Sequence, residues 1–174
     1  PAPACVKEAI EDILETRESV AIHGYTAASG DASVRQGLAD YMNQTYDAQV
    51  RADNFYMTCG AAASLTISLK ALVEGPDDKI ILIAPFFPEY TVFVHNANAK
   101  AVVLPPDTEH FQISLDALEK AITPHTRAII INSPNNPSGV VYSADTYEKL
   151  AALLTRKSQE IGHPIYIISD EPYR

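Results

Sequence analysis

Residues 127–139, RAIIINSPNNPSG, are the most informative stretch of this chain for its fold. The run at residues 128–131 is short and apolar without polar alternation, which is typical of a strand buried in a parallel sheet. The strand cannot continue beyond Asn132, because two prolines lack the N–H that a sheet needs and Asn, Ser and Gly favour turns. Open α/β folds bind ligands where such strands end. The alternative is a plain strand–loop junction, but Asn135 and Asn136 stand between prolines, and we interpret the turn as part of a site.

The chain around this stretch alternates between short apolar runs and amphipathic segments. Five strands are predicted, at residues 55–58, 79–84, 101–104, 127–131 and 165–168. Helices are predicted over residues 61–73, 90–95, 115–122 and 143–160. Strands that alternate with helices indicate right-handed crossovers. The predicted fold class is therefore α/β, with a mainly parallel sheet and helices on both of its faces.

The first part of the chain has helical periodicity instead. Apolar residues at helical spacing predict an amphipathic helix within residues 1–20. A loop of small residues follows at 23–30, and Asp31 is a suitable N-cap for a second helix. That helix is expected to bury four residues, namely Val34, Leu38, Tyr41 and Met42.

Composition limits the classes of function. The 174 residues are 47% hydrophobic and carry a net charge of −9 without a basic run, which argues against nucleic acid and anionic membranes as partners. No apolar run approaches the ~20 residues of a membrane-spanning helix. Cys5 and Cys59 are too few and too far apart for a disulfide framework or a zinc site, so no metal is expected and a reducing, cytoplasmic setting is the default. The chain begins at Pro1 without a Met, so the natural start is expected to lie upstream, and a targeting segment that has been removed remains an alternative.

Three strand ends carry candidate ligand-binding residues. Gly60, Ala61 and Ala62 begin a helix, where small residues let an anion approach free N–H groups, although close helix packing explains them equally well. Phe87 offers a flat face to a planar ligand or else joins the core. Asp170 follows an apolar strand, where a carboxylate would lose solvation unless a cation pairs with it. A helix N-cap is the alternative for Asp170.

With these strand-end motifs in this order along the chain, the sequence resembles the class I/II aminotransferases of fold type I, which use pyridoxal 5'-phosphate. The resemblance runs through essentially the whole chain. Its most specific parts are the motif at residues 133–139 and the D-x-x-Y pattern of Asp170 and Tyr173. It implies that residues 31–174 are the N-terminal portion of the large cofactor-binding domain, and that residues 1–30 form an N-terminal helix and interface loop.

The resemblance implies three catalytic residues. Asp170 matches the aspartate that pairs with the protonated pyridine nitrogen and keeps the ring an electron sink. Asn136 and Tyr173 match the residues that hydrogen-bond the phenolic oxygen of the cofactor, and the asparagine also helps to place the substrate carboxylate.

The resemblance also implies further cofactor contacts. Phe87 matches the aromatic residue that stacks on the ring. Backbone N–H groups around Gly60, Ala61 and Ala62 match the phosphate cup. Tyr25, which by itself is more typical of a packed loop aromatic, matches a tyrosine that reaches the phosphate of the partner subunit. That role requires a homodimer.

The lysine that forms the family's Schiff base is expected in sequence beyond Arg174, so the chain is expected to be an inactive fragment. The expected reaction of the full-length protein is transamination between an amino acid and a 2-oxo acid, with aspartate or another dicarboxylic amino acid as the preferred substrate. Two alternatives share the same motifs. One is another fold-type I enzyme, such as a C–S lyase or an aminocyclopropane-carboxylate synthase-like enzyme. The other is the aminotransferase-like effector domain of a transcriptional regulator.

Overall fold

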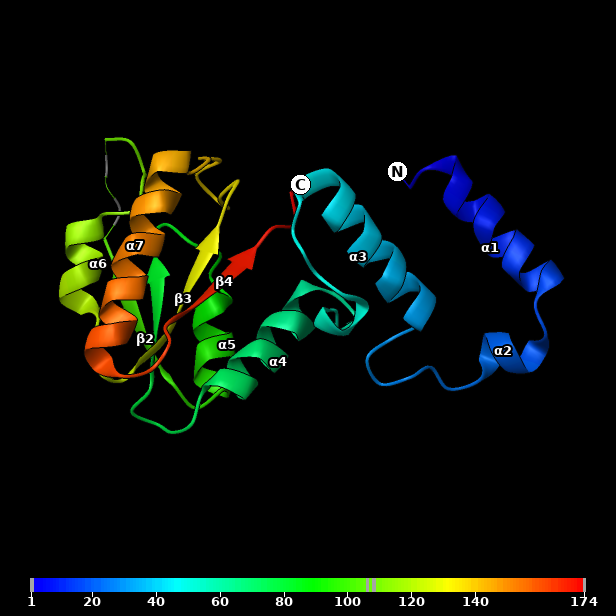
Figure 1. The fold of residues 1–174 in the computed structure, drawn as a ribbon, viewed down its shortest axis with the longest axis horizontal. Coiled ribbons are helices and arrows are strands. Elements are labelled where there is room, and N and C mark those ends of the chain that lie inside the picture. The colour runs from blue at the N-terminus through cyan, green and yellow to red at the C-terminus, as the bar shows by residue number, and fades with distance from the viewer. Residues whose placement is uncertain (1, 106, 108, 174) are drawn as a thin grey trace. The chain divides into compact units, whose positions relative to one another are not determined.

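The computed structural model describes residues 2–105, 107 and 109–173. The chain groups into two compact units, Pro1–Thr58 and Cys59–Arg174 (Figure 1). The second unit holds the sheet and the polar strand ends. The predicted boundary between an interface segment at 1–30 and the cofactor-binding domain at 31–174 stays a prediction.

The second unit is built on a four-stranded sheet of order β2-β1-β3-β4, in which every neighbouring pair is parallel. The strands are β1 (Lys79–Ile83), β2 (Lys100–Leu104), β3 (Thr126–Asn132) and β4 (Tyr166–Asp170). The predicted α/β class with a parallel sheet is confirmed.

Helices cover both faces of this sheet, as Figure 1 shows. They are α4 (Ala61–Leu72), α5 (Tyr90–Asn96), α6 (Leu115–Ala121) and α7 (Ala144–Ile161). Successive strand residues point to opposite faces of the sheet, so β1 and β3 contribute side chains to two separate hydrophobic cores. Ile81 and Ile129 pack in the core with residues of α6 and α7. Ile80 and Ile130 pack in the other with residues of α4 and α5.

Strand register decides where the polar residues meet. Asn132 and Asp170 are the last residues of β3 and β4, and they lie opposite each other in the parallel pairing. Phe87 follows the end of β1, the strand on the other side of β3. Parallel strands therefore bring these three chain segments to one edge of the sheet.

The first unit is helical. Its elements are α1 (Ala4–Thr16), α2 (Ser19–His23), α3 (Ala32–Tyr46) and a short 3-10 helix, η1 (Ala52–Asn54). The predicted N-cap is confirmed, because the Asp31 carboxylate accepts hydrogen bonds from the N–H groups of Ser33 and Val34 at 2.8 and 3.2 Å. The helix predicted within residues 1–20 is interrupted after Thr16, and the part of this prediction that concerns Pro1 lies outside the described residues.

Two predictions for the first unit are wrong. Residues 55–58 form no strand, because the Phe55 N–H donates to Ala52 in a turn and the Met57 N–H donates to Ser29 in a loop. The burial expected along α3 is also absent: Val34 and Tyr41 are 49% and 53% exposed, and Leu38 and Met42 are only half-buried. The helical period was right, but the other elements of this unit do not cover that face.

Within the described residues, no helix combines the length and the apolar composition that crossing a membrane requires.

Candidate functional site

The loop after β3 is held together by Asn135. Its side-chain oxygen Oδ1 accepts hydrogen bonds from the N–H and the hydroxyl of Ser138, at 3.1 and 2.7 Å. Its amide nitrogen Nδ2 donates to the carbonyl oxygen of Pro85, in the loop after β1, at 3.2 Å. The backbone closes the turn, because the Gly139 N–H donates to the Asn135 carbonyl at 2.7 Å. Asn135 is buried and builds the loop, which leaves the side chain of Asn136 to line the site.

Asn132 connects this loop to the neighbouring strand. Its Nδ2 donates to the carbonyl oxygen of Asp170 at 2.7 Å, and its Oδ1 accepts from the N–H of Asn136 at 2.6 Å. The residue is 3% exposed, so these bonds satisfy polar groups that water does not reach. Sequence reasoning treated Asn132 only as the start of a turn. A polar residue that directly ends an apolar strand was the available signal.

Asp170 receives a hydrogen bond on its carboxylate from Tyr90. The Tyr90 hydroxyl donates to Oδ2 at 2.6 Å, from the first residue of α5. Burial raises the pKa of the Tyr90 phenol far above its ordinary value, and the hydrogen bond to Asp170 raises it further. Sequence reasoning placed Tyr90 only at the start of a helix, because nothing local to residue 90 indicates a partner at residue 170.

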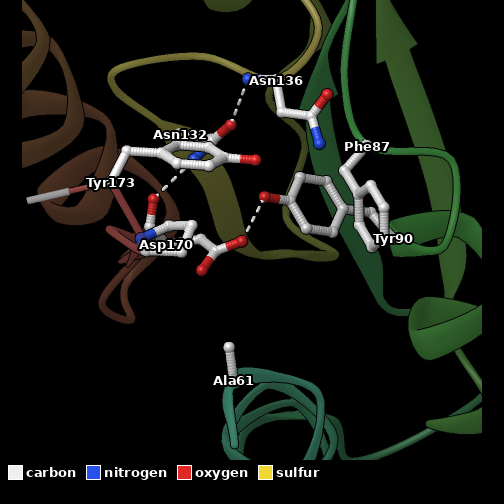
Figure 2. A pocket seen from close by; sticks show the side chains of 8 residues that line it. Ala61, Phe87, Tyr90, Asn132, Asn136, Asp170 and Tyr173 are labelled. Carbon is white, nitrogen blue, oxygen red and sulfur yellow. Dashed lines mark hydrogen bonds between the residues drawn. The ribbon is translucent and has the colours of Figure 1, made fainter. Parts of the chain in front are cut away.

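Tyr90, Asn132 and Asp170 belong to the wall of a cavity of about 200 Å³ at the carboxyl edge of the sheet. Figure 2 shows side chains from several elements directed toward one space. The lining residues are Ala61, Phe87, Tyr90, Asn132, Asn136, Asp170, Pro172 and Tyr173. Two aromatic rings form part of the wall, since Phe87 and Tyr90 meet edge to face with ring centroids 5.8 Å apart.

The start of α4 forms another wall of this cavity. Gly60 is the N-cap of that helix and has a φ of +117°, a conformation that residues with a Cβ rarely adopt. An added Cβ at Gly60 would meet no atom within 4 Å, so the backbone conformation rather than crowding requires glycine here. Ala61, the first residue of the 12-residue helix, lines the cavity. The N–H groups of the first helical turn have no acceptor within their own helix, and together with the helix dipole they favour an anion at such a position.

The structure thus gathers most of the residues that the sequence singled out. Five of them line the cavity: Ala61, Phe87, Asn136, Asp170 and Tyr173. Gly60 and Ala62 flank Ala61 at the helix start and are not among the lining residues. Tyr25 belongs to the other compact unit and is fully exposed.

The arrangement suits a planar ligand that carries a cationic group at one end and an anionic group at another. Asp170 presents a part-buried carboxylate beside aromatic rings, and a cationic group in the cavity could pair with it. Asn136 and Tyr173 add an amide and a phenol, both able to bond a polar oxygen. The N-terminus of α4 supplies donors for an anion.

The amino-acid sequence matches the family described as aminotransferase class I and II over residues 1–174. The chain belongs to this family, whose members use pyridoxal phosphate as their cofactor.

Individual relatives agree with that assignment. A crystal structure of an aminotransferase from Eubacterium rectale is 55% identical and superimposes with a TM-score of 0.98, covering 99% of this chain and 44% of that one. The aspartate aminotransferase of Rhizobium meliloti is 30% identical over 173 residues, 98% of this chain and 40% of that protein. A probable N-succinyldiaminopimelate aminotransferase of Mycobacterium tuberculosis is 33% identical over 158 residues, 87% of this chain and 37% of that protein. The chain therefore spans about two fifths of the length of these curated relatives.

Proposed function

We propose that the full-length protein is a pyridoxal-phosphate-dependent aminotransferase, which moves an amino group between an amino acid and a 2-oxo acid. The observation that carries this proposal is the Asp170 carboxylate, held by Tyr90 at the wall of a cavity lined by aromatic rings. A carboxylate in such surroundings favours a cationic partner, and a protonated pyridine nitrogen is a flat cation of suitable chemistry.

The residues present fit the cofactor at each of its polar groups. Asp170 would pair with the pyridine nitrogen, and Asn136 and Tyr173 would bond the phenolic oxygen. Phe87 would cover the ring face. The N–H groups at residues 60–62 would hold the phosphate, as the start of a helix after a glycine allows.

When bound, pyridoxal phosphate supplies an electron sink for the negative charge that develops at the substrate Cα. The contribution of Asp170 is to keep a proton on the ring nitrogen, because a nearby carboxylate favours the protonated form of a base. The contribution of Asn132 is indirect, since it fixes both Asn136 and the end of β4. The contribution of Phe87 and Tyr90 is to exclude water from one wall of the site.

We infer that the substrate is aspartate or another dicarboxylic amino acid. The support is the names of relatives: aspartate aminotransferase in Rhizobium meliloti and aspartate/prephenate aminotransferase in Nitrosomonas europaea, which is 35% identical over 150 residues. A dicarboxylic 2-oxo acid would then be the amino-group acceptor.

We further infer a homodimer in which residues 1–30 contribute to the interface and residues 31–174 belong to the cofactor-binding domain. In support, no residue of α1 is buried, and four of its apolar side chains are 44–55% exposed, namely Val6, Ile10, Ile13 and Leu14. Tyr25, fully exposed in the same unit, would reach the cofactor phosphate of the partner subunit. A cytoplasmic setting agrees with the exposed thiols of Cys5 and Cys59, which a reducing compartment keeps free.

The test replaces Asp170 with Asn in the full-length protein. This change keeps the size of the side chain but removes the charge that holds the ring nitrogen protonated. Each pKa unit of lost stabilisation corresponds to ~1.4 kcal/mol, so a loss of a few units lowers turnover on the order of 10²- to 10³-fold. Glu171→Gln is the matched control, because it removes a neighbouring carboxylate that is absent from the cavity lining.

The measurement is single-turnover formation of 2-oxo acid from aspartate, followed by amino-group transfer to an added 2-oxo acid. We expect Glu171→Gln to react at the wild-type rate and Asp170→Asn to fall. An unchanged rate in Asp170→Asn would refute the assignment of this carboxylate. Release of a thiol, pyruvate and ammonia from an S-substituted cysteine, without an amino-group acceptor, would instead identify a C–S lyase.

A further inference from the structure

Tyr90 is the only described side chain with a hydrogen bond to the Asp170 carboxylate, and it contacts a single oxygen. Its hydroxyl donates to Oδ2 at 2.6 Å across 80 positions of sequence. On the other side of the residue, Asn132 bonds the backbone carbonyl of Asp170 at 2.7 Å. The main chain is therefore held from β3 and the carboxylate oxygen Oδ2 from α5. The other oxygen, Oδ1, accepts no hydrogen bond from the described part of the chain.

The Tyr90 ring is itself fixed in the core. It is 1% exposed and packs between Phe86, stacked at 6.3 Å, and Phe87, edge to face at 5.8 Å. Leu69 and Val94 belong to the same buried cluster. Because tight packing leaves a buried ring little freedom, the hydroxyl keeps one direction. Figure 2 shows that direction, with the hydroxyl at the end of the ring meeting Asp170.

Tyr90 also remains a donor under ordinary conditions. Burial and the adjacent carboxylate both disfavour the phenolate, which raises the pKa of Tyr90. A phenol that keeps its proton can donate to an ionised carboxylate, and this charge-assisted hydrogen bond is of the stronger kind.

We propose that Tyr90 is a positioning residue for Asp170: it holds Oδ2 so that Oδ1 is presented to the ring nitrogen of the cofactor. This inference rests on the proposed aminotransferase function. It assigns to the first residue of α5 a part in the reaction without contact to the reacting atoms. Removal of the hydroxyl frees the carboxylate to rotate away from the ring nitrogen, although the aromatic packing remains.

The experiment is a double-mutant cycle in the full-length holoenzyme. Tyr90→Phe is made in the wild-type and in the Asp170→Asn backgrounds. A hydrogen bond to a charged group corresponds to about a 10- to 100-fold effect, so kcat should fall by about that factor in the wild-type background. In the Asp170→Asn background the same change should cost less than about threefold, because the carboxylate through which Tyr90 acts is gone. The cofactor dissociation constant should change little, because the proposed phosphate and stacking contacts remain.

A spectroscopic readout separates positioning from a structural effect. The protein is reconstituted with pyridoxal phosphate labelled with ¹⁵N in the ring, and the nitrogen signal reports whether that atom is protonated. In Tyr90→Phe the signal should move toward the unprotonated position. Tyr142→Phe is the matched control, since Tyr142 is a buried tyrosine outside the cavity lining, and it should leave the signal and the rate unchanged.

A conservative variant covers the case in which Tyr90→Phe does not fold. Tyr90→4-aminophenylalanine keeps the ring and places an N–H donor where the hydroxyl was, and it should retain the wild-type nitrogen signal and most of the rate. Failure of this variant to retain them would overturn the proposal, as would a Tyr90→Phe protein with a wild-type signal, or equal losses in both backgrounds. A wild-type protein that binds no cofactor would refute the proposed function itself, which distinguishes the two failures.

Discussion

Replacement of Asn132 with Ala should destabilise the protein and loosen the site together. The side chain makes two hydrogen bonds. Its Nδ2 donates to the Asp170 carbonyl oxygen at 2.7 Å, and its Oδ1 accepts from the Asn136 N–H at 2.6 Å. Each such bond contributes about 0.5–1.5 kcal/mol net, and a buried partner left unsatisfied costs about 1–3 kcal/mol. Because Asn132 is 3% exposed, water replaces these bonds poorly, and we expect a loss of about 2–4 kcal/mol in the free energy of unfolding.

Two assays check this expectation in the full-length protein. Urea unfolding gives the change in stability, provided the dependence on urea stays the same. Amide hydrogen exchange over residues 132–139 gives the local effect, since the Asn136 N–H loses its acceptor and should exchange faster. Affinity for pyridoxal phosphate should also fall, by about tenfold or more, because Asn136, which would bond the phenolic oxygen of the cofactor, is no longer held in place.

Asn96→Ala is the control. Asn96 is exposed at the end of α5, and substitutions at such positions usually change stability by less than about 0.5 kcal/mol. If Asn132→Ala were as mild as Asn96→Ala, and exchange over residues 132–139 were unaltered, the role of Asn132 as the connection between loop and strand would be refuted.

Two further predictions concern stability. Burial alone would raise the pKa of Asp78, but hydrogen bonds from the Glu74 N–H and the Arg127 guanidinium, among others, outweigh it and lower the pKa. The stability that Asp78 contributes is thus present above its unfolded pKa and is lost as pH falls through the lower folded pKa. Asp78→Asn should cost about 2 kcal/mol of unfolding free energy at pH 7. Urea unfolding should show this difference between wild type and variant shrinking below about pH 4. A difference independent of pH would contradict this account. Gly60→Ala should destabilise by about 1–3 kcal/mol, because its φ of +117° strains any residue with a Cβ, whereas Gly75→Ala, at a negative φ with open space around it, should be neutral or stabilising in thermal unfolding. Equal melting temperatures for the two variants would be inconsistent with strain at Gly60.

The helices and strands of the second unit follow from local features of the sequence. Runs such as residues 79–83 and 128–131 are apolar over a strand's length, and the turn residues after them end the strands within one or two positions. These signals are local, because strand burial and proline or asparagine turns depend on neighbouring residues. The candidate site followed from the same signals, since Phe87, Asn136 and Asp170 each stand just after a strand.

Local signals were insufficient where burial depends on distant partners. The segment at residues 55–58 has the composition of a strand, yet a strand requires a neighbour, and its N–H groups bond Ala52 and Ser29 instead. The apolar face of α3 has a helical period, but period alone does not supply a surface to cover Val34 and Tyr41. In both cases tertiary context overrides propensity.

The way in which the site residues are held depends on contacts between distant parts of the chain. Tyr90 and Asp170 are 80 positions apart and meet at 2.6 Å, and Asn132 joins the Asp170 backbone across 38 positions. Each residue alone fits another role, a core tyrosine or a turn asparagine. Their roles differ because parallel pairing sets β3 and β4 in register and so brings Asn132 level with Asp170, while core packing against the two phenylalanines fixes the Tyr90 ring. Register and packing are properties of the assembled sheet, and no single segment of the sequence encodes them.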